Sequence, residues 1–306
     1  MAFEPPRFRW SFFTPRFWLL WCGLGLAWLV VQLPYPVLLP IGRWVGRMVM
    51  RFGKGRRAIA ERNLELCFPE LDPQERAALL RKNFESMGIS VLEVGISWWW
   101  PKWRVYRLFE LEGEENLKAV EGQGALMLCL HFSTLEIGAG YLGHIADIDC
   151  MYRRHKNPLF DWVQQRGRQR HSLDGETIER EDVRTMIRSL RKKHRIWYAP
   201  DQDYGRKQSL FVPFFGVTAA TVTATSRFAR LGNARVLPCI QTRLPDGRGY
   251  RLSILPPLDD FPGDDEFADA KRVNELIEQE IRKQPEQYMW LHRRFKTRPE
   301  GEPRLY

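Results

Sequence analysis

The chain has 306 residues, of which 44% are hydrophobic and 27% charged, a composition typical of a folded protein and not of a disordered one. Lys and Arg number 47 against 37 Asp and Glu, and the resulting formal charge of +10 favours an anionic partner. The five cysteines are scattered without CxxC spacing. This pattern predicts reduced thiols and argues against a disulfide framework or a cysteine-based zinc site.

An uncharged run near the N-terminus extends from Phe17 to Gly42, and its first half is almost wholly apolar. The run is about as long as a bilayer-crossing helix, although three prolines interrupt its second half. A cleaved signal peptide and a buried core helix are the alternatives, but no small-residue cleavage site follows the run. We therefore expect a membrane anchor with its basic flank over residues 1–45 and one catalytic domain over residues 46–306.

Basic residues follow the apolar run almost without acidic neighbours: Arg43, Arg47, Arg51, Lys54, Arg56, Arg57 and Arg62. By the positive-inside rule, this excess predicts that the large C-terminal portion faces the cytoplasm. The first three arginines recur every four residues, so on a helix they would form one stripe facing anionic headgroups. A solvated helix face is an equally good interpretation of that stripe.

Residues 57–97 have a helical apolar period that is broken near Pro69 and Pro73. A tryptophan cluster follows at Trp98, Trp99, Trp100 and Trp103. Such a cluster forms an interfacial anchor, the lining of an apolar groove, or part of a packed core.

Short apolar runs alternate with helical periods from about residue 105. Strands are expected over residues 125–130, 148–152, 195–199, 235–242 and 250–255. Helices are expected near residues 134–144, 158–170, 179–193, 220–231 and 265–283. The alternation predicts an α/β domain with a mixed, mostly parallel sheet flanked by helices.

The first expected strand ends directly at His131, and Glu136 follows five residues later. In open α/β sheets, functional groups gather beyond the carboxyl ends of strands. If His131 lies on the turn and Glu136 in the first helical turn, the carboxylate can hold the imidazole as a general base. Ser133 and Glu136 also match a capping box, so a purely structural role for Glu136 is the alternative.

Asp201 and Asp203 follow another expected strand, with Gly205 permitting a tight turn, and a plain turn is the alternative. Between the two strand ends lie Arg166, Arg168 and Arg170, whose guanidinium groups suit phosphate, carboxylate or an oxyanion. A solvated basic helix end is the structural alternative for any one of the three.

Other motifs of known chemistry are missing from the sequence. There is no GxGxxG after a strand, no GxxxxGK[ST] and no GxSxG elbow. The remaining histidines lack ligand spacing, so we expect no metal site and no cofactor. Nucleic-acid binding is supported by net charge alone, and we do not expect it.

Four sequence blocks in this order carry a family resemblance: His131–Glu136, Asn157–Trp162, Trp197–Gly205 and Pro285–Pro299. Together they closely resemble the late acyltransferases of bacterial lipid A biosynthesis, of the lauroyltransferase type. The resemblance extends over the whole chain. It places the sequence in the wider glycerolipid acyltransferase group, in which the usual HxxxxD motif is HxxxxE in the lipid A branch. By position, it implies catalytic roles for His131, Glu136, Arg168 and Asp201.

The resemblance also implies substrates and a location. The donor is an acyl group, lauroyl in this type, on acyl carrier protein. The acceptor is a hydroxyl of a 3-hydroxyacyl chain on a membrane-embedded, Kdo-bearing lipid A precursor with two phosphates. The implied location is the bacterial inner membrane. In this interpretation His131 takes the hydroxyl proton, Glu136 holds the ring, Arg168 binds an anionic group or the oxyanion, and Asp201 braces the site.

Substrate-binding side chains are expected at Arg166, Arg170, Asp203, Arg293 and Arg294. The last two belong to a basic C-terminal run beside aromatic residues, which suits acceptor phosphates at a membrane boundary. The alternative functions are a myristoyl- or palmitoleoyl-transferring relative, a hydrolase using the same residues, and a non-catalytic membrane-anchored protein that binds anionic lipid.

Overall fold

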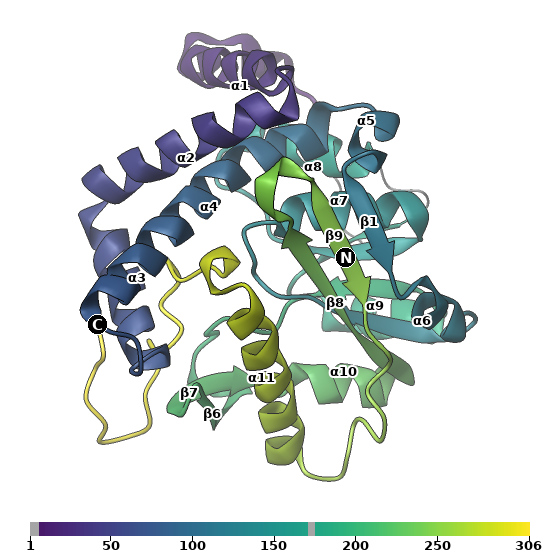
Figure 1. Ribbon diagram of the computed structural model, residues 1–306. Helices are drawn as coiled ribbons and strands as arrows, with labels where there is room; N and C mark the ends of the chain where they lie inside the picture. Colours follow the sequence, from purple (N-terminus) through teal and green to yellow (C-terminus); the bar gives the residue numbers. More distant parts are fainter. Residues whose placement is uncertain (1–5, 171–174) are drawn as a thin grey trace.

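The computed structural model describes residues 6–170 and 175–306. Within these ranges a seven-stranded sheet has the order β1-β9-β8-β2-β5-β3-β4, and a separate hairpin lies beside it (Figure 1). The sheet strands are β1 (Phe109–Glu112), β2 (Gly124–Leu128), β3 (Ile148–Tyr152), β4 (Thr177–Glu179), β5 (Arg195–Tyr198), β8 (Ala234–Arg243) and β9 (Tyr250–Ile254). Every neighbouring pair in the sheet is parallel except β8 and β9.

Helices cover both faces of this sheet and extend beyond it at the N-terminal end (Figure 1). They are α1 (Trp18–Val31), α2 (Tyr35–Phe52), α3 (Lys54–Cys67), α4 (Pro73–Trp99), α5 (Lys102–Tyr106), α6 (Glu114–Ala119), α7 (Leu135–Ile145), α8 (Pro158–Gln169), α9 (Val183–Arg191), α10 (Ala224–Gly232) and α11 (Glu266–Lys283). The prediction of a mixed, mostly parallel sheet flanked by helices is confirmed. The sequence analysis missed β1, β4 and the hairpin of β6 (Ser209–Phe214) and β7 (Val217–Val222).

Strand β2 lies at the centre of the sheet, and all five of its residues are buried. Leu126 and Leu128 face one core cluster, whereas Ala125 and Met127 face another on the opposite side. Alternation of side chains along a strand produces this division. A strand covered on both faces needs a continuous apolar run, which is the pattern seen in the sequence.

Helix α4 is the platform on which the N-terminal helices pack. It begins at a capping box in which the Asp72 side chain accepts hydrogen bonds from the backbone of Gln74 and Glu75. Helix α2 approaches it at Gly46, where an added Cβ would lie 2.0 Å from the carbonyl oxygen of Phe84. The expected boundary between residues 45 and 46 lies inside α2, and the division into two domains stays a prediction.

A buried ion pair joins α4 to the sheet. Arg243 on β8 donates to both carboxylate oxygens of Glu93 at 2.6 Å, and the hydroxyl of Tyr250 donates to the same carboxylate at 2.8 Å. Arg243 also donates to Ser86 at 2.7 Å and to Ser133 at 3.3 Å. The network therefore fixes the loop before α7 against α4.

The expected membrane-spanning anchor is not supported by the N-terminal helices that the structure describes. Helix α1 has 14 residues, so it extends about 21 Å at 1.5 Å per residue. Over residues 6–170 and 175–306, no helix is both long and apolar enough to cross a bilayer. The structure thus does not support a single membrane-spanning anchor, and residues 1–5 of the expected anchor lie outside the described residues.

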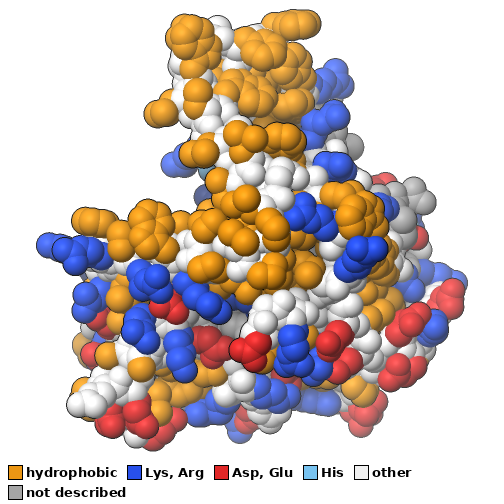
Figure 2. Space-filling model, turned by 45° about the horizontal axis from the view of Figure 1, so that its top comes forward, with side chains coloured by type: hydrophobic (Ala, Val, Ile, Leu, Met, Phe, Trp, Pro, Cys, Tyr) orange, Lys and Arg blue, Asp and Glu red, His pale blue; other side chains and the backbone are white. Residues whose placement is uncertain are grey.

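A continuous apolar surface covers these helices instead. Figure 2 shows hydrophobic side chains gathered over the projecting N-terminal part, with Lys and Arg side chains beside them. Its largest exposed members are Trp10, Phe13, Trp18, Leu19, Leu26, Trp28, Leu29, Val37, Trp44, Val49 and Phe52. We call this set the apolar face.

Candidate active site

His131 lies in the turn that leaves the carboxyl end of β2 and leads into α7. The backbone of this turn is held by the C-terminal segment, because Met289 N–H donates to the His131 carbonyl at 3.0 Å and Ser133 N–H donates to the Gln287 carbonyl at 2.6 Å. The side chain of Gln241 on β8 donates to the Leu130 carbonyl at 2.8 Å. The imidazole is thus presented from a fixed backbone.

Asp201 follows β5 and is the carboxylate that holds the His131 ring. Its Oδ1 lies 2.6 Å from His131 Nδ1, and its Oδ2 accepts the His131 backbone N–H at 2.9 Å. The Asp201 side chain is fully buried. Burial alone would raise its pKa, but the His131 charge and the hydrogen bonds from His131 lower the pKa below its ordinary value. An ionised Asp201 on Nδ1 leaves Nε2 as the nitrogen that can act as a base.

Glu136 lies on the first turn of α7 and binds other partners. Its carboxylate accepts Arg168 Nε at 2.8 Å, an Arg168 terminal nitrogen at 2.6 Å, and Trp98 Nε1 at 2.8 Å. Burial opposes ionisation of Glu136, yet the Arg168 charge and the hydrogen bonds from Arg168 and Trp98 lower its pKa overall. Glu136 and Arg168 therefore form a two-pronged ion pair.

This geometry corrects the contact expected from the sequence. We expected Glu136 to hold the His131 ring and Asp201 to brace the site, whereas Asp201 holds the ring and Glu136 holds Arg168. The five-residue spacing suggests that Glu136 contacts His131, but spacing within one segment says nothing about Asp201, which follows the neighbouring strand β5. The capping alternative is wrong as well, since the side chain of N-cap residue Thr134 makes no cap hydrogen bond and Ser133 binds Ser86.

The three arginines near the end of α8 have different environments. Gly167 lets α8 approach α4, since an added Cβ would lie 2.4 Å from Cγ of Trp98, and this contact brings Arg168 to Glu136. Arg170 donates to the Trp99 carbonyl at 3.2 Å, and Arg166 lies 5.7 Å from the Trp162 ring centre. Arg168 is therefore the arginine that the structure brings to the motif of His131 and Glu136.

Two other expected substrate-binding residues form hydrogen bonds within the protein. Asp203 accepts hydrogen bonds from Gly205 N–H at 2.9 Å and from the Thr297 backbone and hydroxyl at 2.7 and 2.8 Å. Arg294 is 2% exposed and donates to the Ala220 carbonyl at 2.7 Å. Both side chains tie the C-terminal segment to the fold, so we leave them out of the proposed binding surface. Arg293 is exposed.

His292 is a site residue that the sequence analysis did not single out. Its Nε2 accepts the Asp203 backbone N–H at 3.2 Å. Burial and the nearby charge of His131 lower the pKa of His292 to about 4. A neutral His292 therefore adjoins the Asp201–His131 pair without adding a second positive charge.

A cavity of about 1060 Å³ opens at these groups. His131, Glu136 and Arg168 line it, together with apolar residues of α7, β3 and α10. Several cationic side chains also line it: Arg153, Arg154, Lys156, Arg180 and Lys207. Across residues 6–170 and 175–306, no cluster of three or more His, Cys, Asp or Glu side chains is placed to hold a metal ion.

Comparison with known proteins identifies the family. The family model for bacterial lipid A biosynthesis acyltransferases matches residues 5–297. The chain belongs to this family. It is 47% identical to the lipid A biosynthesis lauroyltransferase of Escherichia coli strain K12, over 98% of this chain and 99% of that protein. It is 45% identical to the palmitoleoyltransferase of the same strain, over 99% of both chains, and 32% identical to its myristoyltransferase, over 98% and 94%.

The chain is therefore an acyltransferase of lipid A biosynthesis, as the sequence blocks implied. Trp98 is the residue of this acyltransferase site whose role the sequence analysis left undecided. Its ring is 3% exposed and its N–H binds Glu136, whereas Trp103 in the same cluster is 59% exposed. The available sequence signal was the tryptophan cluster itself, which does not reveal the partner of an indole N–H.

Replacement of Asp201 by Asn tests its role in this acyltransferase. Asp201→Asn keeps the shape of the side chain but removes the charge that stabilises a protonated His131 ring. We expect kcat to fall by about 100-fold or more, because the base can no longer be oriented and stabilised. Initial rates and circular dichroism of the purified variant measure the effect. Near-normal turnover in a folded Asp201→Asn protein would contradict the assignment.

The neutral His292 predicts a pH dependence of stability. Its folded pKa of about 4 lies below the ordinary value of 6.5, so the unfolded chain binds a proton that the folded chain does not. This contribution to stability is complete above pH 6.5 and is lost as the pH falls toward 4. His292→Gln can still accept the Asp203 N–H and cannot titrate. We expect urea unfolding between pH 7 and 5 to show a smaller loss of stability in this variant, and equal losses would refute the effect.

Proposed function

We propose that this acyltransferase moves a medium-chain acyl group, lauroyl in the first instance, from acyl carrier protein to a hydroxyl of a 3-hydroxyacyl chain on a Kdo-bearing lipid A precursor. The hydrogen bond of 2.6 Å between Asp201 and His131, a residue that lines the cavity, carries the proposal. The name of the 47% identical lauroyltransferase supports the choice of acyl group.

The reaction follows from the two ion pairs. His131 Nε2 takes the proton of the acceptor hydroxyl as its oxygen attacks the thioester carbonyl carbon, and Asp201 stabilises the resulting imidazolium. Arg168 binds Glu136 through Nε and one terminal nitrogen, which leaves the other terminal nitrogen to donate to the oxyanion. The C–S bond then breaks, and the thiolate takes the proton from His131.

Direct transfer needs no covalent enzyme intermediate. Cys150 is the cysteine that lines the cavity, and burial raises the pKa of its thiol to about 11. At neutral pH it is therefore a thiol, and only a thiolate is a strong nucleophile. The acyl group can pass straight to the acceptor when both substrates are bound.

The cationic lining suits an acidic donor protein. Arg153 and Lys156 follow the carboxyl end of β3, Lys207 lies in the segment after β5, and all three line the cavity. A carrier protein with acidic helices would be guided to these cations by long-range attraction that weakens with salt. This is the support in the structure for acyl carrier protein as the partner.

The apolar face supports attachment to the cytoplasmic surface of the inner membrane. Helix α2 presents Trp44, 57% exposed, and Phe52, 74% exposed, on a helix that also carries Arg43, Arg47 and Arg51. Interfacial helices combine aromatic side chains that enter the acyl boundary with cations that meet anionic lipids. We propose that α1 and α2 lie in this interface and place the cavity next to the acceptor.

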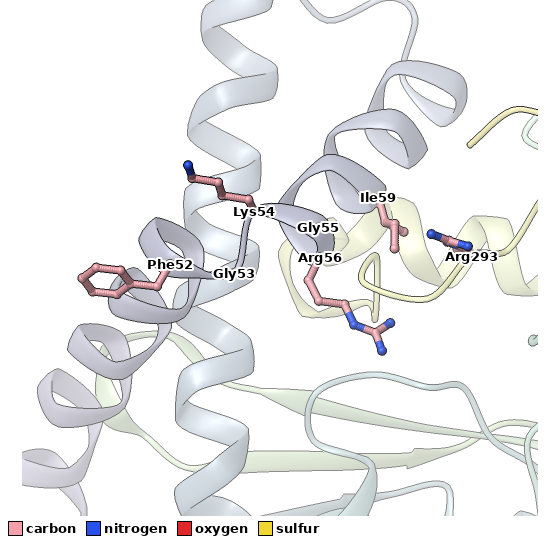
Figure 3. A pocket seen from close by; sticks show the side chains of 7 residues that line it. All are labelled: Phe52, Gly53, Lys54, Gly55, Arg56, Ile59 and Arg293. Carbon is pink, nitrogen blue, oxygen red and sulfur yellow. The ribbon is translucent and has the colours of Figure 1, made fainter.

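Arg293 extends this surface around the end of α2. It comes from the C-terminal segment and points toward Ile59 on α3, with Arg56 nearby (Figure 3). These residues line a hollow of about 730 Å³ together with Phe52 and Lys54. We propose that Arg293 and Arg56 contact acceptor phosphates there, and that Arg166 and Arg170 extend the cationic surface at the end of α8.

The function is tested with His131→Ala and defined substrates. Lauroyl-loaded acyl carrier protein and the Kdo-bearing tetraacylated precursor are mixed with enzyme. The mass of the lipid product is then determined by mass spectrometry. We expect addition of one lauroyl group by the native enzyme and a loss of about 100- to 10,000-fold in His131→Ala. Release of free fatty acid without acylated lipid would instead show a thioesterase. Equal activity of both proteins would refute the general base.

Membrane attachment is tested with vesicles of phosphatidylethanolamine and phosphatidylglycerol. The double variant Trp44→Gln, Phe52→Gln should bind at least about 10-fold more weakly, because two large apolar side chains no longer enter the interface. Phe267→Gln on α11 is the matched control, since Phe267 is 43% exposed and lies outside the apolar face. Equal loss in both proteins, or none in either, would contradict the proposed orientation.

A further inference from the structure

The cavity reaches both faces of the sheet. Trp197 and Tyr198 are consecutive on β5, and both line it. Since successive side chains of a strand point to opposite faces, the cavity passes around the carboxyl end of β5. The core clusters agree, because Trp197 packs with residues of α7 and Tyr198 packs with Phe228 of α10. We call the two parts the α7 arm and the α10 arm.

The α7 arm is lined by one bare face of its helix. Glu136, Ala139, Gly140 and Gly143 follow a spacing of three and four residues, so they share a face, and all four line the cavity. Beyond the Glu136–Arg168 pair, this face presents no side chain larger than a methyl group. The lining on this side also includes Ile148, Cys150 and Trp197, and Ser97 of α4 lies over Gly140, where an added Cβ would be 2.4 Å from its hydroxyl oxygen. The arm is therefore a mostly apolar channel, with the Glu136–Arg168 pair at the end of the helix that begins near His131.

The length of this channel matches a medium acyl chain. From Leu135 to Gly143 the helix rises about 12 Å at 1.5 Å per residue. A zigzag hydrocarbon chain advances about 1.25 Å per bond when its C–C bonds are about 1.5 Å long. With the thioester carbon level with Leu135, at the start of α7, about ten further carbons reach Gly143.

We propose that the α7 arm holds the acyl chain of the donor and that Gly143 sets the length of the chain transferred. This inference rests on the proposed acyl transfer and specifies one determinant of it. Within residues 6–170 and 175–306, a Cβ added at Gly143 meets no atom within 4 Å, so a larger side chain there would extend into space that these residues leave open. Gly138 on the same helix faces the protein instead, where a Cβ would lie 2.8 Å from Gln241.

The test is a competition among acyl carrier proteins loaded with decanoyl, lauroyl and myristoyl groups. Gly143→Leu shortens the channel and raises helix propensity, so the variant should fold. Each methylene that no longer fits costs about fourfold in binding, so the decanoyl-to-lauroyl product ratio should rise about 15-fold. Gly143→Ala should shift the ratio in the same direction by a smaller factor. Mass spectrometry of the lipid product gives the ratios.

Ala224→Leu is the matched control, because Ala224 lines the α10 arm and receives the same side chain. It should leave the donor ratio unchanged. A native enzyme that acylates the acceptor with none of these donors would refute the proposed function. A native enzyme that transfers lauroyl, combined with an unchanged ratio in Gly143→Leu or a shifted ratio in Ala224→Leu, would overturn the assignment of the α7 arm alone.

Discussion

The hydrogen bond between Asp201 and His131 depends on the register of two parallel strands. Leu128 of β2 pairs with Tyr198 of β5, and His131 and Asp201 each lie three residues further along their own chains. Two turns that leave neighbouring strands at the same level bring the imidazole and the carboxylate within 2.6 Å. A slip of one residue in this pairing would reverse the faces of all β5 side chains and separate the two groups. The core of the sheet is therefore also what aligns the base.

The C-terminal segment maintains this alignment from outside the sheet. Its backbone binds the His131 and Ser133 turn, the Tyr288 hydroxyl donates to the Asp201 carbonyl at 3.3 Å, and Thr297 binds Asp203. Buried backbone and charged groups must find partners, and several partners of this segment belong to the two turns that carry the candidate site. Other partners lie elsewhere, since Arg294 donates to Ala220 and Thr221 of β7. The segment therefore braces the fold along most of its length. Of the adjacent arginines Arg293 and Arg294, Arg293 is the exposed one.

The parts of the fold that the sequence predicted are those with long periodic signals. Strand β3 has the expected bounds of residues 148–152, and α11 begins and ends within a residue of expectation. The three residues of β4 are too few to establish a period, and β1 is only partly buried, so neither stood out. The sequence predicts a helix from residue 220, because small side chains such as those of residues 220–222 fit a helix or a strand, but these residues end the β7 strand.

The candidate site shows a different limit of prediction from sequence. The sequence and its family resemblance predict catalytic roles for His131, Glu136, Arg168 and Asp201, and the structure places these residues in two pairs. Which carboxylate faces which cation depends on strand register and on the close approach of α8 to Trp98, neither of which is a local property. Arg293 and Arg294 are neighbours with the same charge, yet only Arg294 is buried. Spacing and charge could not distinguish them, because burial is decided by the hairpin packed beside that arginine.

The division into two pairs has an electrostatic consequence for the proposed reaction. An unpaired arginine in the same cavity as His131 would oppose the positive charge that the imidazole gains when it accepts a proton. Glu136 binds Arg168 through two hydrogen bonds and offsets that charge, so Asp201 remains the counter-ion of His131 alone. Arg168 stays ionised, because the Glu136 charge and hydrogen bonds raise its pKa against the opposing effect of burial. The Arg168 guanidinium keeps its charge, and the Glu136 carboxylate offsets that charge. Arg168 can therefore donate a hydrogen bond to an oxyanion without preventing protonation of His131. In the reaction that we propose, Glu136 would therefore act through Arg168 and not through the imidazole.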